Sequence, residues 1–430
     1  MLGGGTFISQ NKKLPGSYIN FVNAKTGSAT MSDRGVVAMA LELDWGIDNE
    51  VFKVTSEDFI KNSLKIFGYD YSHEKMKGLR DLFLNATTLY AYRLNSGEQA
   101  SNTYAKAKCS GIRGNDLKIV IQKDVDNETK FVVKTYFDTK EVDSQIVTDA
   151  KGLVDNDYVE FIKSATLEIT AGAPLAGGTN GSTIGDSHQS FLDKIESYGF
   201  NAIATLSEDE TVRSLYVAFT KRLREEVGSK FQAVLYNKSA DYEGIVNVAN
   251  TTVEGNTNLV YWVTGIIAGC SVNSSNTNKL YDGEFTVNAD YTKSQLEDAI
   301  DTGKFILHKM GDEITVLEDK NSLVATTDDK GEDFKSNQVI RVIDQYAKDI
   351  ANIFNNSYIG NIQNDADGRT AFWNDIVTYC QQLQTLGAIQ DFSEEDVSIA
   401  EGNDKKTVAV ECSIEPVCAM SKLYMTVVVE

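Results

Sequence analysis

The sequence is poor in proline, in basic residues and in long apolar runs. Only 3 of its 430 residues are prolines, whereas 32 are glycines, so helices and strands are rarely interrupted and backbone freedom comes from glycine. Lys and Arg number 41 against 62 Asp and Glu, which gives a net charge of −21. Nucleic-acid binders carry the opposite sign, so direct DNA or RNA binding is disfavoured. The charge instead serves solubility or complements a basic partner surface.

No stretch is apolar for long enough to cross a membrane. The longest, Leu259–Val272, has about 14 residues and includes Gly265 and Gly269, whereas a spanning helix needs about 20. Residues Met1–Phe7 are rich in glycine and lack the apolar centre of a signal peptide. We therefore expect a soluble protein that is made in the cytoplasm, with no direct membrane insertion.

The five cysteines form no recognisable framework. Their number is odd, their spacing is wide and no C-x-x-C occurs, which argues against a disulfide scaffold or a zinc site. Buried free thiols in a reducing compartment are the expectation. No cofactor or metal is predicted.

The bulk composition indicates a folded chain of several domains. Hydrophobic residues make up 42% and aromatic residues 10%, and a chain of this length divides into about three domains. The pattern of apolar, polar and turn-forming residues along the chain predicts six segments. They are an N-terminal arm (1–32), an α+β part of a core (33–95), an inserted β-sandwich (96–176), an α/β core domain (177–320), an α+β C-terminal domain (321–418) and a C-terminal arm (419–430).

Both ends of the chain carry short strand patterns. In the last twelve residues Leu423, Met425, Val427 and Val429 alternate with more polar positions, which is the period of a β-strand. A strand at a chain end frays unless it has a partner. We predict that both arms pair with copies of the chain, while a simple edge strand within its own domain stays open as the alternative. The predicted pairing residues are Tyr18, Ile19, Asn20, Phe21, Val22, Leu423, Tyr424, Met425, Thr426, Val427, Val428 and Val429.

Between the arms the pattern changes twice. Short strand-like runs such as 117–121 and 131–137, separated by polar turns, predict the β-sandwich. From residue 182 onward, helices and strands alternate with short links, which predicts a parallel sheet. The pairs Thr55 with Asp58, Ser207 with Glu210 and Thr292 with Gln295 predict capped helix starts. A hairpin is expected around Gly311, between 305–308 and 314–317.

Several stretches together resemble contractile phage tail sheath proteins. Residues 6–7 and 15–22 (PGSYINFV) resemble their N-terminal arm, and 109–117 (CSGIRGNDL) the start of their β-sandwich. The following junction, the α/β domain and the C-terminal arm are matched by 175–181 (LAGGTNG), 265–269 (GIIAG) with 278–284 (NKLYDGE), and 423–427 (LYMTV). The fold implied is a multidomain α/β protein with a subtilisin-like, non-catalytic core, an inserted β-sandwich, an α+β C-terminal domain and extended strand arms.

The resemblance also implies a function. In that family, arms of neighbouring subunits pair as strands and join stacked hexameric rings into a helical sleeve around an inner tail tube. The implied partners are other copies of the chain, the tube protein, and baseplate and tail terminator proteins. The sleeve would contract and drive the tube through a bacterial envelope. The implied location is a phage tail, or a released bacteriocin particle, assembled in the bacterial cytoplasm.

An oligomeric α/β hydrolase is the alternative function. It would need a Ser-His-Asp arrangement, yet the chain has three histidines and no G-x-S-x-G elbow. His188 lies at a predicted helix start, where a solvated polar cap is the simpler interpretation.

Three other motifs have plain structural interpretations. The acidic loops around Asp124 and Asp365 lack the register of a calcium loop and are expected to be exposed. The glycine pair at 265 and 269 is expected to let a helix lie close to a sheet. The mixed charges of 221–226 (KRLREE) predict a solvated helix face, with an intersubunit contact as the alternative.

Overall fold

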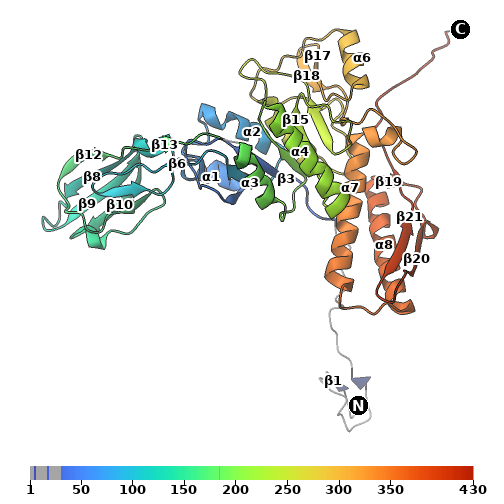
Figure 1. Ribbon diagram of the computed structural model, residues 1–430, viewed down its shortest axis with the longest axis horizontal. Coiled ribbons are helices and arrows are strands. Elements are labelled where there is room, and N and C mark those ends of the chain that lie inside the picture. The colour runs from blue at the N-terminus through green and yellow to red at the C-terminus, as the bar shows by residue number, and fades with distance from the viewer. Residues whose placement is uncertain (1–3, 6–16, 19–30, 184, 430) are drawn as a thin grey trace. The chain divides into compact units, whose positions relative to one another are not determined.

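The computed structural model describes residues 4–5, 17–18, 31–183 and 185–429 (Figure 1). The chain divides into two compact units. The larger contains Asp33–Gln345 and Pro416–Glu430, and the smaller contains Met1–Ser32 and Tyr346–Glu415.

A six-stranded sheet forms the centre of the larger unit. Its order is β16-β15-β14-β3-β5-β4, and all neighbours are parallel except β4, which pairs antiparallel with β5. The parallel sheet expected from the alternating pattern is therefore present. The strands are β3 (Val36–Leu41), β4 (Val51–Thr55), β5 (Thr88–Arg93), β14 (Ala202–Ala204), β15 (Gln232–Tyr236) and β16 (Ile245–Val248).

Helices cover both faces of this sheet (Figure 1). Val37, Met39 and Leu41 of β3 join a core with α1 (Ser56–Phe67), α2 (Lys77–Phe83) and α5 (Leu259–Gly269). The alternate residues Ala38 and Ala40 face a second core with α3 (Gly185–Ile195) and α4 (Glu210–Arg222). Because successive side chains of a strand point to opposite faces, a strand buried on both faces is apolar throughout.

Local capping signals place several helix ends. Thr55 and Asp58 form the predicted capping box of α1, which ends at Gly68 with a left-handed φ of 76°. Thr292 caps α6 (Lys293–Asp301) in the same way, with Gln295.

The prediction that Ser207 caps the next helix is wrong. Asp209 caps α4, because its carboxylate accepts from the backbone N–H groups of Thr211 and Val212. Ser207 precedes this cap by two residues, and its hydroxyl accepts a hydrogen bond from the backbone N–H of Asp209.

A β-sheet module with its own core lies between β5 and α3 in the sequence. Its main sheet is antiparallel, in the order β10-β9-β8-β12, and buries Ile119, Ile121, Val133 and Phe137. The short pair β6 and β13 joins the segments that enter and leave it. The strands are β6 (Gly97–Glu98), β7 (Ala105–Ala107), β8 (Leu117–Lys123), β9 (Phe131–Phe137), β10 (Lys140–Val147), β11 (Val159–Phe161), β12 (Thr170–Pro174) and β13 (Thr179–Asn180).

The predicted hairpin at Gly311 is confirmed as β17 (Leu307–Met310) and β18 (Glu313–Val316). Gly311 has a φ of 67°, a left-handed conformation that glycine adopts without strain. In another part of the larger unit, Asp241 accepts hydrogen bonds from the backbone N–H groups of Val324 and Ala325.

Gly265 and Gly269 bring α5 close to another helix rather than to a sheet. A Cβ added at Gly265 would meet the carbonyl of Leu82 in α2, and one at Gly269 would overlap the carbonyl oxygen of Asn85 just after α2. The expectation that these glycines serve a helix-to-sheet approach is wrong, because they face α2, although α5 itself does pack on the sheet on the same face as α2.

The charged run 221–226 is not a solvated face throughout. Arg224 is buried and binds Asp344 through both terminal nitrogens, at 2.6 and 2.8 Å. It also donates to the carbonyl oxygen of Phe231 at 2.6 Å. The prediction is wrong for Arg224, because the carboxylate that satisfies it lies 120 residues away in the sequence.

The smaller unit is built from a helix and a hairpin. In Figure 1, α8 (Ala366–Leu386) lies beside β20 (Val397–Glu401) and β21 (Val408–Cys412), which form a two-stranded antiparallel sheet.

The remaining elements of the described chain, from both units, are β1 (Gly4–Gly5), β2 (Ser17–Tyr18), α7 (Asn337–Ile353), β19 (Ile389–Gln390), β22 (Glu415–Pro416), the 3-10 turns η1 (Glu74–Met76), η2 (Ile112–Asp116), η3 (Ala150–Gly152), η5 (Glu332–Lys335) and η7 (Glu394–Asp396), and the π turns η4 (Leu223–Val227) and η6 (Phe354–Tyr358).

The cysteines are free but not uniformly buried. Only Cys380 is fully buried, whereas Cys109, Cys270 and Cys412 are partly exposed and Cys418 is exposed. The expectation of five buried thiols is wrong, and most clearly for the exposed Cys418, which directly precedes the C-terminal arm.

Candidate assembly site

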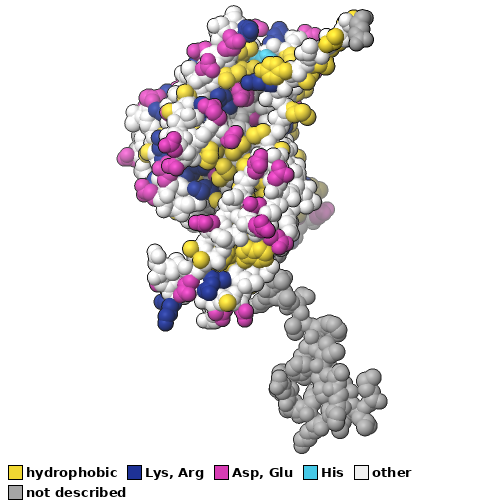
Figure 2. All heavy atoms as spheres, turned by 90° about the vertical axis from the view of Figure 1, so that its right-hand side faces the viewer, with side chains coloured by type: hydrophobic (Ala, Val, Ile, Leu, Met, Phe, Trp, Pro, Cys, Tyr) yellow, Lys and Arg dark blue, Asp and Glu magenta, His cyan; other side chains and the backbone are white. Residues whose placement is uncertain are grey.

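The described part of the C-terminal arm, residues 420–429, is extended and exposed. These residues join no sheet within the described chain. Leu423 is 84% exposed, Tyr424 91% and Val429 89%. In Figure 2 the hydrophobic side chains of the arm follow one another toward its end at the upper right.

This exposure is costly for a chain segment of such composition. Burying an aliphatic or aromatic side chain contributes about 1.5–3 kcal/mol. The arm offers five such aliphatic groups at Leu423, Met425, Val427, Val428 and Val429 and leaves all of them in solvent. An alternating apolar segment with free backbone groups is a ready template for pairing with another chain.

The arm is fastened at its base by one side chain of α7. The amide of Gln338 donates from Nε2 to the carbonyl oxygen of Val417 at 3.0 Å. Its Oε1 accepts from the backbone N–H of Ala419 at 3.0 Å. Gln338 itself is 3% exposed. The two bonds fix the position at which the exposed arm begins.

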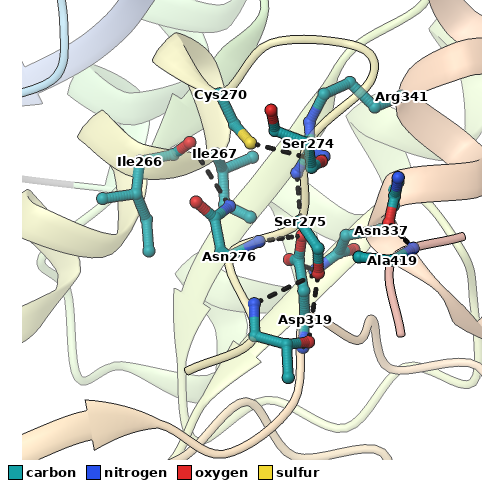
Figure 3. Close-up of polar contacts among 12 residues, drawn as sticks. Ile266, Ile267, Cys270, Ser274, Ser275, Asn276, Asp319, Asn337, Arg341 and Ala419 are labelled. Atoms are coloured by element: carbon teal, nitrogen blue, oxygen red, sulfur yellow. Dashed lines mark hydrogen bonds and ion pairs between the residues drawn. The ribbon is translucent and has the colours of Figure 1, made fainter. Parts of the chain in front are cut away.

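The two hydrogen bonds of Gln338, which we call the clamp, adjoin a buried polar network (Figure 3). The carboxylate of Asp319 accepts from Arg341 at 3.0 Å, from Asn337 at 3.0 Å and from the backbone N–H of Asn276 at 2.9 Å. Arg341 also donates to the carbonyl oxygen of Ser274 at 2.7 Å. The network holds the first turns of α7, and therefore Gln338, against the loops that follow α5 and β18.

The charges in this network stabilise each other. Burial alone would lower the pKa of the Arg341 guanidinium, but the negative charge of Asp319 raises it above its ordinary value. Both side chains are 1% exposed, so removing either one would leave an uncompensated buried charge.

The β20–β21 hairpin offers strand edges that can accept another strand. Each of its two strands has one neighbour within the described chain. The indole N–H of Trp373 donates to the carbonyl oxygen of Val397 at 2.9 Å, which anchors β20 on α8. Most residues of β21, including Ala409 and Val410, are exposed. Two-stranded sheets are marginal alone and gain stability when strands are added.

The structure places the predicted pairing residues unequally. Leu423, Tyr424, Met425, Thr426, Val427, Val428 and Val429 form one continuous exposed segment. Tyr18 belongs to β2, which runs parallel to β1 with Tyr18 opposite Gly5. Ile19, Asn20, Phe21 and Val22 lie outside the described residues.

Sequence reasoning missed the base of the arm. Gln338 lies about 80 residues from the segment it holds, and Asp319 and Arg341 are 22 residues apart. No local pattern marks these residues, because each is defined by partners that only the tertiary fold brings together.

His188 is not a solvated cap, so that prediction is wrong. It is 4% exposed and its Nδ1 lies 3.2 Å from the hydroxyl of Tyr216. Desolvation lowers its pKa. Ser207 and Asp209 line the same hollow, but their hydrogen bonds go to the backbone at the start of α4, so these two residues and His188 form no Ser-His-Asp relay.

Two further kinds of feature, membrane-spanning helices and clusters of metal ligands, are absent from the described residues. None of their helices is long and apolar enough to cross a membrane. No group of three or more metal-ligating side chains occurs among them. Asp365 accepts from the backbone N–H of Gly368 as the cap of α8.

Four family models match consecutive parts of the chain. They are the Tail sheath protein Gp18 domain III N-terminal region over residues 34–94 and the Phage tail sheath protein beta-sandwich domain over 95–180. The Phage tail sheath protein central domain matches 181–322, and the Phage tail sheath C-terminal domain matches 329–430. The match at 95–180 confirms the predicted β-sandwich domain.

Known proteins resemble the chain over nearly its whole length. The phage-like element PBSX protein XkdK of Bacillus subtilis is 30% identical over 99% of both chains. The crystal structure of a sheath tail protein from Desulfitobacterium hafniense is 35% identical, covers 95% of this chain and 99% of its own, and has a TM-score of 0.84. The contracted helical sheath of the anti-feeding prophage shares the fold, with a TM-score of 0.57 at 13% identity and coverage of 96% and 99%. The chain belongs to the phage tail sheath family of contractile systems, whose members are structural proteins and not enzymes.

Proposed function

We propose that this protein polymerises by intersubunit β-augmentation into a helical sleeve of stacked hexameric rings around an inner tail tube. The observation that carries the proposal is the exposed, alternating arm at 420–429, which has no sheet partner in its own described chain. In strand addition, main-chain hydrogen bonds supply affinity and the alternation of side chains supplies register.

The acceptor that fits the arm is the β20–β21 hairpin of another copy. An added strand would extend this sheet, whose outer edges have no neighbouring strand in the described chain. Because donor and acceptor are different surfaces of one subunit, the contact is heterologous, and such contacts generate rings or open helical filaments. In this proposal, the N-terminal residues Tyr18–Val22 supply a second strand that also pairs with a neighbouring subunit.

Contraction is the finer part of the proposal. The related sheath of the anti-feeding prophage forms a helical assembly that has been seen in a contracted state. We infer that the sleeve of this protein also assembles extended and contracts to drive the tube through a bacterial envelope, triggered by the baseplate. Strand pairing would hold neighbours together while the rigid bodies rotate, and a kinetic barrier would hold the extended state.

The proposed partners and location follow the same reasoning. They are other copies of the chain, the inner tube protein, and baseplate and tail terminator proteins, in a phage tail or bacteriocin particle assembled in the bacterial cytoplasm. We retain the six predicted segments and the subtilisin-like core as part of the proposal. The alternative function, an oligomeric α/β hydrolase, is wrong, because the family is structural.

Deletion of the arms tests the assembly. Chains lacking residues 423–430, or 1–22, should stay folded by circular dichroism and remain monomeric, whereas the full chain forms sleeves in negative-stain electron microscopy. Filaments of normal appearance from either deletion would refute the proposal.

A proline scan of residues 424–428 tests the strand pairing itself. Proline removes a backbone N–H, and in an edge strand alternate N–H groups point toward the partner. Prolines that block assembly at every second position would identify an added edge strand, and blocking at every position would place the arm between two strands. Assembly that tolerates all five prolines would exclude strand addition.

A further inference from the structure

The central sheet contains a point at which its connections change direction. From β3 the chain continues through α1 and α2 to β5, on one side of β3. From β14, on the other side of β3, it continues through α4 to β15. The helices of these two connections lie on opposite faces of the sheet. In open α/β sheets, the carboxyl ends of the strands at such a point leave a crevice in which ligands bind.

A hollow of about 420 Å³ lies at this position. Its lining comes from the carboxyl ends of β3, β5 and β14 and from the starts of α3 and α4, and it includes Glu42, Leu94, His188, Thr205, Asp209 and Val212. This volume suits a small molecule or a single inserted side chain.

The charged side chains that line the hollow in the described chain are both acidic. Glu42 follows the last residue of β3 and is exposed. Asp209 is exposed and caps α4 through one carboxylate oxygen, Oδ1. The backbone N–H groups of Thr211 and Val212 lower the pKa of Asp209. It is therefore ionised at neutral pH.

The buried imidazole of His188 adds a third polar group. Its Nδ1 lies 3.2 Å from the hydroxyl of the fully buried Tyr216, and its Nε2 has no hydrogen-bond partner among the described residues. His188 lines the hollow, and when its Nδ1–H donates to Tyr216, Nε2 carries the lone pair and can accept a hydrogen bond. Because burial lowers the pKa of His188, the ring is neutral and does not repel a cation.

We propose that this crevice binds a small organic cation, namely a primary ammonium on a short apolar stem. The carboxylates of Glu42 and Asp209 and the Nε2 of His188 accept the three N–H groups, while Leu94 and Val212 pack against the stem. The cation is either a free alkylamine or the lysine side chain of a neighbouring protein.

Calorimetric titration of the full-length chain with n-butylammonium tests the proposal. We expect saturable binding that 1-butanol, of similar shape but uncharged, and butyrate do not reproduce. Glu42→Gln and Asp209→Asn should each weaken it by about tenfold or more, since each removes one charge-assisted hydrogen bond. Asparagine still caps α4, so the second variant preserves the helix start.

Glu208→Gln is the matched control. It removes a neighbouring carboxylate that binds Asn256 and does not line the hollow, so affinity should be unchanged. Comparable binding of Nα-acetyl-lysine methylamide would identify a lysine side chain as the guest, and its exclusion a free amine. No saturable heat up to tens of millimolar, equal binding of 1-butanol or butyrate, or full affinity in both acidic-site variants would overturn the proposal.

Discussion

Replacing Gln338 by methionine should release the base of the C-terminal arm. Methionine keeps the length and packing of the side chain but removes both hydrogen bonds that hold residues 417 and 419. A neutral hydrogen bond contributes about 1 kcal/mol net, so the two together contribute about 2 kcal/mol. We expect this segment to open roughly 30-fold more often, since 1.4 kcal/mol corresponds to a factor of ten.

Hydrogen exchange at the backbone N–H of Ala419 measures the effect directly, because this group donates to Gln338 Oε1. In Gln338→Met, the amide should exchange roughly 30-fold faster, while amides in β3 and β14 keep their protection. Gln189→Met is the control, since Gln189 is exposed on α3 and donates to Asp193 of the same helix. An unchanged exchange rate at Ala419 in Gln338→Met would show that the arm is held by other contacts and would refute the clamp.

Three further substitutions test the core and its charges. Gly269→Ala should destabilise the fold by about 3 kcal/mol in urea denaturation, because the added Cβ would overlap a backbone carbonyl. Gly199→Ala, which has open space around it, should be near neutral. Equal effects of the two substitutions would contradict this packing. Arg224→Met should lower the free energy of unfolding by about 3–5 kcal/mol, because it leaves the carboxylate of Asp344 buried and unpaired. Adding Asp344→Leu should recover most of this loss. No recovery in the double variant would show that the pair matters for another reason. Two backbone N–H groups lower the pKa of Asp241, so its contribution to stability is present above the ordinary carboxyl pKa and is lost as pH falls through the folded value. Asp241→Asn keeps the acceptor without the charge and should flatten the acid side of the stability–pH curve; an unchanged curve would exclude this linkage.

The sequence by itself determined the features that depend on neighbouring residues. The capping boxes at Thr55 and Thr292 and the hairpin at Gly311 are local, because their hydrogen bonds join residues a few positions apart. The alternation of Leu423, Met425 and the valines that follow is equally local, so the arm could be recognised as a segment in need of a partner. The order of helices and strands likewise predicted the parallel sheet.

The tertiary structure alone decided which distant groups meet. Gln338 holds the arm, Arg341 meets Asp319 and Arg224 meets Asp344 across 22 to 120 residues of sequence. His188 was misjudged for the same reason, since its burial against Tyr216 depends on how α3 and α4 pack on the sheet. The crevice lined by Glu42, His188 and Asp209 exists only because the sheet reverses its winding between β3 and β14. A local pattern fixes which elements form and which faces are apolar, but long-range packing fixes what those faces and charges touch.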